Sequence, residues 1–133
     1  MRLYFFRHAI AEDADDQTPD EQRALTDEGI ARTKRAAQLF KPLGIKPDHI
    51  YTSPLVRAKQ TAEIVGEVLG IEVEERAEVG PGFSIAAVET LTRELGNEEV
   101  LFVGHEPDFS TTITSLTGGR VTMKRGGLAR VEV

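Results

Sequence analysis

Two of the three histidines in the chain, His8 and His105, follow short apolar segments that are typical of buried strands. Residues 3–6 lead to His8, and residues 100–103 lead to His105. The carboxyl ends of parallel strands meet at one edge of a sheet, where ligands bind. We therefore expect the two imidazoles to share such an edge, where a neutral ring nitrogen can serve as a nucleophile.

Arginines accompany the two histidines. Arg7 directly precedes His8, and Arg57 falls in the first turns of a segment that opens with Ser53-Pro54, a capping residue followed by a proline suited to the first helical position. Guanidinium groups, imidazoles and the free N–H groups of helix starts all bind phosphoryl oxygens. These residues predict a phosphate-shaped anion site, and Ser53 is interpreted as a helix cap because no base is paired with it.

The positive site would be local, because the chain as a whole is acidic. Its 133 residues include 16 Lys+Arg and 22 Asp+Glu, for a net charge of −6. This balance argues against nucleic acid or an anionic membrane as the main partner. No apolar stretch approaches the roughly 20 residues of a membrane span, so we expect a cytoplasmic protein. The absence of cysteine excludes thiolate nucleophiles, disulfides and Cys-ligated metals.

Strand-like and helix-like segments alternate along the chain. We expect strands over residues 2–6, 49–52, 71–75, 100–103, 121–123 and 128–133. We expect helices that start after Thr26, Ser53 and Ser84 and at Pro107, the second running to about residue 69 and the third to residue 95. The pattern predicts one α/β domain over residues 1–133, a three-layer α/β/α sandwich with a mostly parallel six-stranded sheet and one antiparallel strand.

Three motifs together resemble the histidine phosphatase superfamily, in its short SixA-type branch. They are Phe6-Arg7-His8-Ala9, Thr52-Ser53-Pro54-Leu55-Val56-Arg57-Ala58-Lys59-Gln60-Thr61 and Val103-Gly104-His105-Glu106-Pro107. The central segment, in the family's order and spacing, makes the combination specific, and the match covers essentially the whole chain. The resemblance implies a phosphoglycerate mutase-like fold.

The resemblance also implies that His8 accepts the phosphoryl group and that Arg7, Arg57 and His105 hold its oxygens. The chemistry of these residues agrees, because an imidazole can attack phosphorus in line while fixed cations neutralise the equatorial oxygens. Water would then hydrolyse phospho-His8. Since the cations supply the charge that Mg²⁺ otherwise gives, we expect no metal and no other cofactor.

Two further residues are candidates for the site. Arg23 lies in a segment that resembles the branch's Arg-Pro-Leu-Thr, and it is either a ligand at the phosphate rim or one half of a surface ion pair. Many superfamily members place a general acid after the third strand, where Glu78 is the candidate. Glu12 and Asp13 are alternatives, although an acidic loop is ordinarily solvated.

The substrate is expected to be large. The short connection from the third strand to the helix at Ser84 leaves no room for a lid, and an open site suits a phosphohistidine presented on another protein. Its imidazole leaving group also demands less of a general acid than an alkoxide does. We expect a monomeric phosphatase that acts on a phosphorelay or phosphotransfer carrier.

Other functions are weighed against this one. A small-molecule phosphomonoesterase would use Glu78 as its acid, whereas a non-catalytic phosphate-binding regulatory module would be expected to have lost His8 or an arginine. A mutase is disfavoured because it needs an enclosed site. No Gly-x-Gly-x-x-Gly follows the first strand, so nicotinamide or flavin binding is not expected. Two arginines would repel a cation held by His8 and His105.

Overall fold

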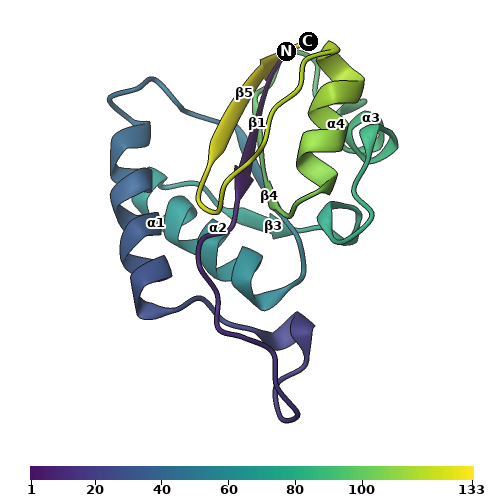
Figure 1. Cartoon of the computed structure of the whole chain (residues 1–133). Helices are drawn as coiled ribbons and strands as arrows, with labels where there is room; N and C mark the ends of the chain where they lie inside the picture. Colours follow the sequence, from purple (N-terminus) through teal and green to yellow (C-terminus); the bar gives the residue numbers. More distant parts are fainter.

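The structure, a computed structural model, describes residues 1–133 and contains one five-stranded sheet in the order β3-β2-β4-β1-β5 (Figure 1). Its strands are β1 (Arg2–Arg7), β2 (His49–Thr52), β3 (Val73–Glu75), β4 (Val100–Gly104) and β5 (Leu128–Glu132). Its helices are α1 (Asp27–Phe40), α2 (Val56–Leu69), α3 (Ile85–Thr92) and α4 (Asp108–Thr117), with 3-10 turns η1 (Asp20–Gln22) and η2 (Ala77–Val79). Neighbouring strands are parallel except β5, which is antiparallel to β1.

The helices cover both faces of the sheet, so the expected three-layer α/β/α arrangement is confirmed (Figure 1). Along β1, alternate side chains enter opposite cores: Phe5 packs with α3 and α4, and Phe6 packs with α1 and α2. Both cores are built on β1 and β4, whose apolar residues are almost entirely buried. A strand that is buried on both faces has a continuous run of apolar residues. Residues 3–6 and 100–103 have such runs, and these runs predicted the two strands.

The parallel register between β1 and β4 brings the two histidine motifs to the same edge of the sheet. Arg7 pairs with Gly104, and the N–H of His8 donates to the carbonyl of Gly104 at 3.2 Å. One residue further along each strand, His8 and His105 therefore leave the sheet side by side. The fold thus places the two imidazoles together before any side-chain interaction is considered.

The expectation of six strands is wrong, because residues 121–123 form no strand. The backbone groups of Met123 bind side chains instead of a neighbouring strand. The N–H of Met123 donates to the Glu106 carboxylate at 3.3 Å, and its carbonyl accepts from Arg7 Nη1 at 2.9 Å. The side chain of Met123 is buried in one of the cores, which explains the apolar pattern that resembled a strand.

Helix boundaries agree with the sequence in part. The hydroxyl of Thr26 accepts from the N–H of Gly29 at 3.0 Å, so the cap of α1 is confirmed. In contrast, α2 begins at Val56 and not at Pro54, and α3 ends at Thr92, short of the expected residue 95. None of the helices is both long and apolar enough to span a membrane.

Candidate active site

A hollow of about 290 Å³ opens at the carboxyl edge of β1 and β4. Its lining is almost entirely polar and comprises Arg7, His8, Ala11, Asp13, Arg23, Arg57, His105, Glu106 and Arg125. The predicted phosphate ligands Arg7, Arg57 and His105 and the predicted nucleophile His8 are thus brought together, and Arg23 lies with them. Four arginines around one small hollow in a chain of net charge −6 form a local anion site.

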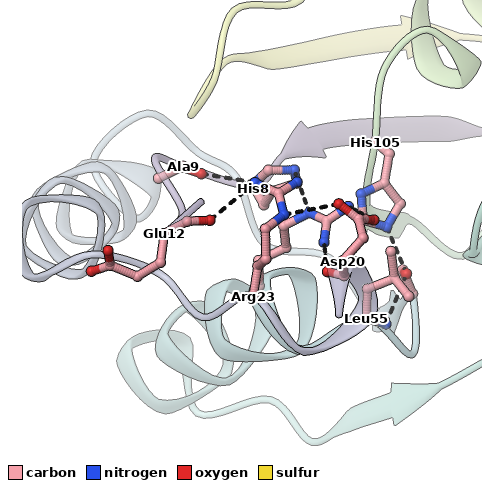
Figure 2. A network of polar contacts seen from close by, with 9 residues as sticks. His8, Ala9, Glu12, Asp20, Arg23, Leu55 and His105 are labelled. Atoms are coloured by element: carbon pink, nitrogen blue, oxygen red, sulfur yellow. Dashed lines mark hydrogen bonds and ion pairs between the residues drawn. The ribbon is translucent and has the colours of Figure 1, made fainter. Parts of the chain in front are cut away.

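The His8 ring presents Nε2 as an unprotonated acceptor. Its Nδ1 lies 2.7 Å from the carbonyl of Ala9, which only accepts, so Nδ1 carries the proton and Nε2 does not (Figure 2). Burial, and after it the positive charges of Arg57 and Arg7, lowers the pKa of His8 to about 4, although the Ala9 hydrogen bond opposes this shift. At neutral pH the imidazole is therefore uncharged and nucleophilic.

Arg57 holds the His8 ring from α2. Its Nε–H donates to His8 Nε2 at 3.3 Å, and its side chain is 8% exposed. The outer edge of the guanidinium faces Asp20: Nη1 donates to the backbone carbonyl at 2.7 Å, and Nη2 donates to Oδ2 at 3.2 Å. Each nitrogen of the Arg57 guanidinium thus makes one hydrogen bond within the protein, with one edge toward the imidazole and the other toward Asp20.

Ser53 orients the His105 ring. The sequence analysis interpreted Ser53 as a helix cap and did not predict this role. The hydroxyl of Ser53 accepts from the N–H of Leu55 at 3.2 Å and lies 2.7 Å from His105 Nε2. The hydroxyl proton has no other acceptor, so it points to Nε2 and the imidazole proton resides on Nδ1. Burial, then the charges of His8 and Arg57, lowers the pKa of His105 to about 3, so this ring is a neutral N–H donor.

Two buried donors at the site lack any partner, and these are Nδ1 of His105 and Nε of Arg7. His105 is 7% exposed, and its ring centroid lies 5.3 Å from that of His8. An unsatisfied buried donor costs about 1–3 kcal/mol, and such groups concentrate where a ligand binds. Two of them beside a neutral His8 indicate that an anion with several acceptor oxygens completes the site.

Glu106 connects α4 to the loop that holds Arg7. Its carboxylate accepts from the N–H and the hydroxyl of Ser110 and from the N–H of Met123. The Met123 carbonyl in turn accepts from Arg7 Nη1 at 2.9 Å. Through this chain of contacts, Glu106 holds the Arg7 guanidinium in place, and its oxygens are occupied as acceptors.

The remaining candidate acids differ in their positions. Glu78 is not among the residues that line the hollow, and its carboxylate lies 3.6 Å from Arg76. The Glu12 carboxylate points away from the two imidazoles (Figure 2). Asp13 lines the hollow. No group of three or more His, Cys, Asp or Glu side chains is arranged to hold a metal ion.

Several residues of the site were missed from the sequence. Glu106 directly follows His105 in the third motif, and this adjacency could have marked it. Asp20 stands three residues before Arg23, a spacing that favours an ion pair in a helical turn, and their side chains do pair at 2.8 Å. No sequence feature marks Arg125 as a residue of the site, because it reaches the hollow from an irregular loop far along the chain.

Comparisons with known proteins agree with this geometry. The sequence profile described as "Histidine phosphatase superfamily (branch 1)" matches residues 3–80. An uncharacterized protein of Picosynechococcus sp. is 38% identical over 136 residues, covering 96% of this chain and 82% of the relative. The phosphohistidine phosphatase SixA of Escherichia coli is 29% identical over 124 residues, covering 90% of this chain and 76% of the relative.

Comparison of the fold with solved structures also identifies SixA proteins. A solved structure of the protein histidine phosphatase SixA in complex with tungstate superposes with a TM-score of 0.88 at 26% identity, covering 100% of this chain and 88% of the other. The profile match spans more than half of the chain and includes His8 and Arg57. The chain therefore belongs to the histidine phosphatase superfamily (branch 1).

Proposed function

We propose that the protein is a phosphatase in which His8 is transiently phosphorylated and that its substrate is phosphohistidine on another protein. The observation that carries this proposal is the placement of two unpartnered buried donors, on Arg7 and His105, beside the neutral Nε2 of His8. A phosphoryl group offers the acceptor oxygens that these donors lack. The SixA relatives, whose names state action on phosphohistidine, support the choice of substrate.

The reaction has two in-line steps. The lone pair of His8 Nε2 attacks phosphorus, the P–N bond of the substrate breaks, and its electron pair leaves with the substrate imidazole, which already carries a proton on its other nitrogen. Water then attacks the phosphorus of phospho-His8, the P–N bond breaks with its electron pair returning to Nε2, and inorganic phosphate leaves as H2PO4⁻ with both protons of the water, which restores neutral His8. Arg7, Arg57 and His105 donate to the phosphoryl oxygens in both steps and so stabilise the charge on them.

The carboxylates at the site favour a P–N substrate. An alkoxide leaving group needs a proton in the transition state, whereas the leaving imidazole of phosphohistidine does not. Glu106 is engaged as an acceptor of three hydrogen bonds, and Asp20 is paired with two arginines. Neither of these two carboxylates is placed to donate a proton, and Asp13, an exposed residue of the lining, is the remaining candidate acid.

The shape of the site favours a substrate carried on a protein. The segment between β3 and α3 contains only the 3-10 turn η2, and the hollow is polar and open. Such a site buries little of a small metabolite, but it admits a side chain that projects from a partner's surface. The positive charge comes from the protein's own guanidinium groups, so we propose that the reaction needs no metal.

The proposal is tested by comparing turnover of a phosphohistidine-bearing carrier protein with that of a panel of phosphate monoesters, in the presence of EDTA. We expect a preference of at least about a hundredfold in kcat/KM for the carrier, equivalent to roughly 2.7 kcal/mol. His8→Ala should abolish both activities. The reverse preference would identify a small-molecule phosphomonoesterase, and activity that survives the loss of His8 would overturn the mechanism.

A further inference from the structure

The edge of Arg57 that should bind phosphate is occupied by another residue of the same chain. Nη1 and Nη2 of Arg57 donate to the backbone carbonyl and to Oδ2 of Asp20 at 2.7 and 3.2 Å. Parallel N–H groups on one guanidinium edge are the arrangement that holds two oxygens of a phosphoryl group. The Asp20 carboxylate therefore occupies Nη2, a donor that a phosphoryl ligand could use, while the Asp20 carbonyl occupies Nη1.

Asp20 engages Arg23 at the same time. Its Oδ1 accepts from Arg23 Nε at 2.8 Å, so each oxygen of one carboxylate takes an N–H from a different arginine. Figure 2 shows the Asp20 carboxylate between Arg23 and His105. Burial alone would raise the pKa of Asp20, but the guanidinium groups of Arg57 and Arg23 outweigh this effect and hold the pKa below its ordinary value. The carboxylate is charged at neutral pH and imitates a bound anion.

Only the side chain of Asp20 has to move to free Nη2 of Arg57 and Nε of Arg23. Asp20 begins η1, and its carbonyl accepts from both Arg57 Nη1 and the N–H of Arg23, which fixes the backbone. The side chain is 56% exposed, so its carboxylate can rotate into water. After such a rotation, Arg57 keeps its contacts with His8 and with the Asp20 carbonyl and gains a free Nη2, while Arg23 gains a free Nε.

We propose that the Asp20 carboxylate is a built-in competitor for the phosphoryl group, displaced when substrate binds and returning to help expel the product phosphate. This inference rests on the proposed function, because the competing anion is the phosphoryl group of its substrate or product. This competition would promote product release, because the four arginines around the hollow would otherwise retain inorganic phosphate. It lowers affinity for the free anion without removing any group that stabilises the transition state.

The size of the effect follows from how often the contact forms. When a binding-competent state is populated only in part, the apparent Kd is the intrinsic Kd divided by that fraction, so a contact made about 90% of the time weakens binding about tenfold. Substitution of Asp20 should therefore tighten phosphate binding by up to about tenfold. If Asp20 served only to hold Arg57 in place, its substitution would weaken binding, so the sign separates the two roles.

The experiment measures the Kd of inorganic phosphate by calorimetry for the wild type, Asp20→Asn and Asp20→Ala. Asp16→Asn is the matched control, because Asp16 is an exposed aspartate of the same loop that makes no hydrogen bond or ion pair, so it reports the loss of one negative charge alone. We expect both Asp20 variants to bind phosphate several-fold more tightly than the wild type and Asp16→Asn. Turnover should show stronger product inhibition by phosphate in the same two variants.

Two results would overturn the inference. One is an unchanged or weaker phosphate affinity in both Asp20 variants, with thermal unfolding showing that they are folded. The other is an equal gain in Asp16→Asn, which would assign the effect to net charge. Failure of the proposed function has a different signature, because the wild type itself would then not turn over the carrier, whatever its affinity for phosphate.

Discussion

The Nε–H of Arg57 donates to Nε2 of His8 over 3.3 Å, so the proposed nucleophilic atom rests against a cation in the free protein. Two consequences follow from this contact. The guanidinium disfavours protonation of the imidazole, and it places a proposed phosphate-binding group within reach of the atom proposed to attack phosphorus. Under the proposed mechanism, activation of His8 and binding of the phosphoryl group depend on the same side chain.

The pKa values of the two histidines predict an unusual acid tolerance of the site. With pKa values of about 4 for His8 and about 3 for His105, both rings stay neutral at pH 5.5, where an ordinary imidazole with a pKa of about 6.5 is mostly protonated. We expect NMR titration of the free protein to show both rings neutral down to about pH 5. Midpoints near 6.5 for either ring would contradict this account of the site.

The same shifts set the direction of the pH dependence of stability. Both histidines have lower pKa values in the folded than in the unfolded state, so the unfolded chain binds more protons below about pH 6.5. The free energy of unfolding should therefore fall as the pH is lowered from 7 toward 4. Urea denaturation at pH 7 and pH 5 measures this, and equal or greater stability at pH 5 would contradict the burial of two neutral rings.

Ser53→Ala should impair catalysis through His105. Without the hydroxyl, Nε2 loses its donor and the proton is free to move from Nδ1, so we expect kcat to fall about ten- to a hundredfold, as for other small misplacements of a catalytic group. Thr52→Val is the matched control, because it removes a buried hydroxyl one residue away that contacts only a backbone carbonyl. NMR of the imidazole nitrogens should show a changed tautomer of His105 in Ser53→Ala alone.

Glu106→Gln should reduce activity equally for all substrates. The amide cannot accept all three hydrogen bonds that the carboxylate accepts, so the Met123 carbonyl and with it Arg7 lose their fixed position. We expect kcat/KM to fall about tenfold whatever the leaving group, because a positioning contact is lost. A loss that grows with the leaving-group pKa in a series of aryl phosphates would instead assign Glu106 as the general acid.

Glu78→Gln should have little effect. Its carboxylate lies beside Arg76 and outside the lining of the hollow, so we expect kcat/KM to change by no more than about twofold with either a phosphohistidine carrier or a phosphate monoester. The measurement is steady-state turnover of both substrates. A selective loss of monoester turnover would show that Glu78 supplies a proton and would favour the phosphomonoesterase alternative.

Much of the fold could be predicted because its central strands are buried on both faces. Residues 3–6 and 100–103 are continuous apolar runs, and the parallel alternation of elements implies that they end at one edge. Residues 121–123 were misread because Met123 is buried while its backbone binds Arg7 and Glu106. A local apolar pattern reports burial, and it does not reveal whether backbone partners are strands or side chains.

The site could be predicted where its residues lie on regular elements. His8, His105 and Arg57 follow directly from two strand ends and one helix start. Arg125 could not be placed, because it reaches the hollow from an irregular segment, and the contact of Asp20 with Arg57 depends on the path of the loop that carries η1. Such loop residues contribute to a site through tertiary structure, which no spacing along the chain encodes.

Trapping of phosphorylated His8 tests the central claim most directly. The protein is mixed with a phosphohistidine-bearing carrier, quenched within milliseconds in alkali, where phosphohistidine survives, and mapped by peptide mass spectrometry. We predict phosphate on His8, formed and lost at rates that account for steady-state turnover and absent from His8→Ala. Turnover without phosphate on His8, or with phosphate on His105 or His49 instead, would contradict the account.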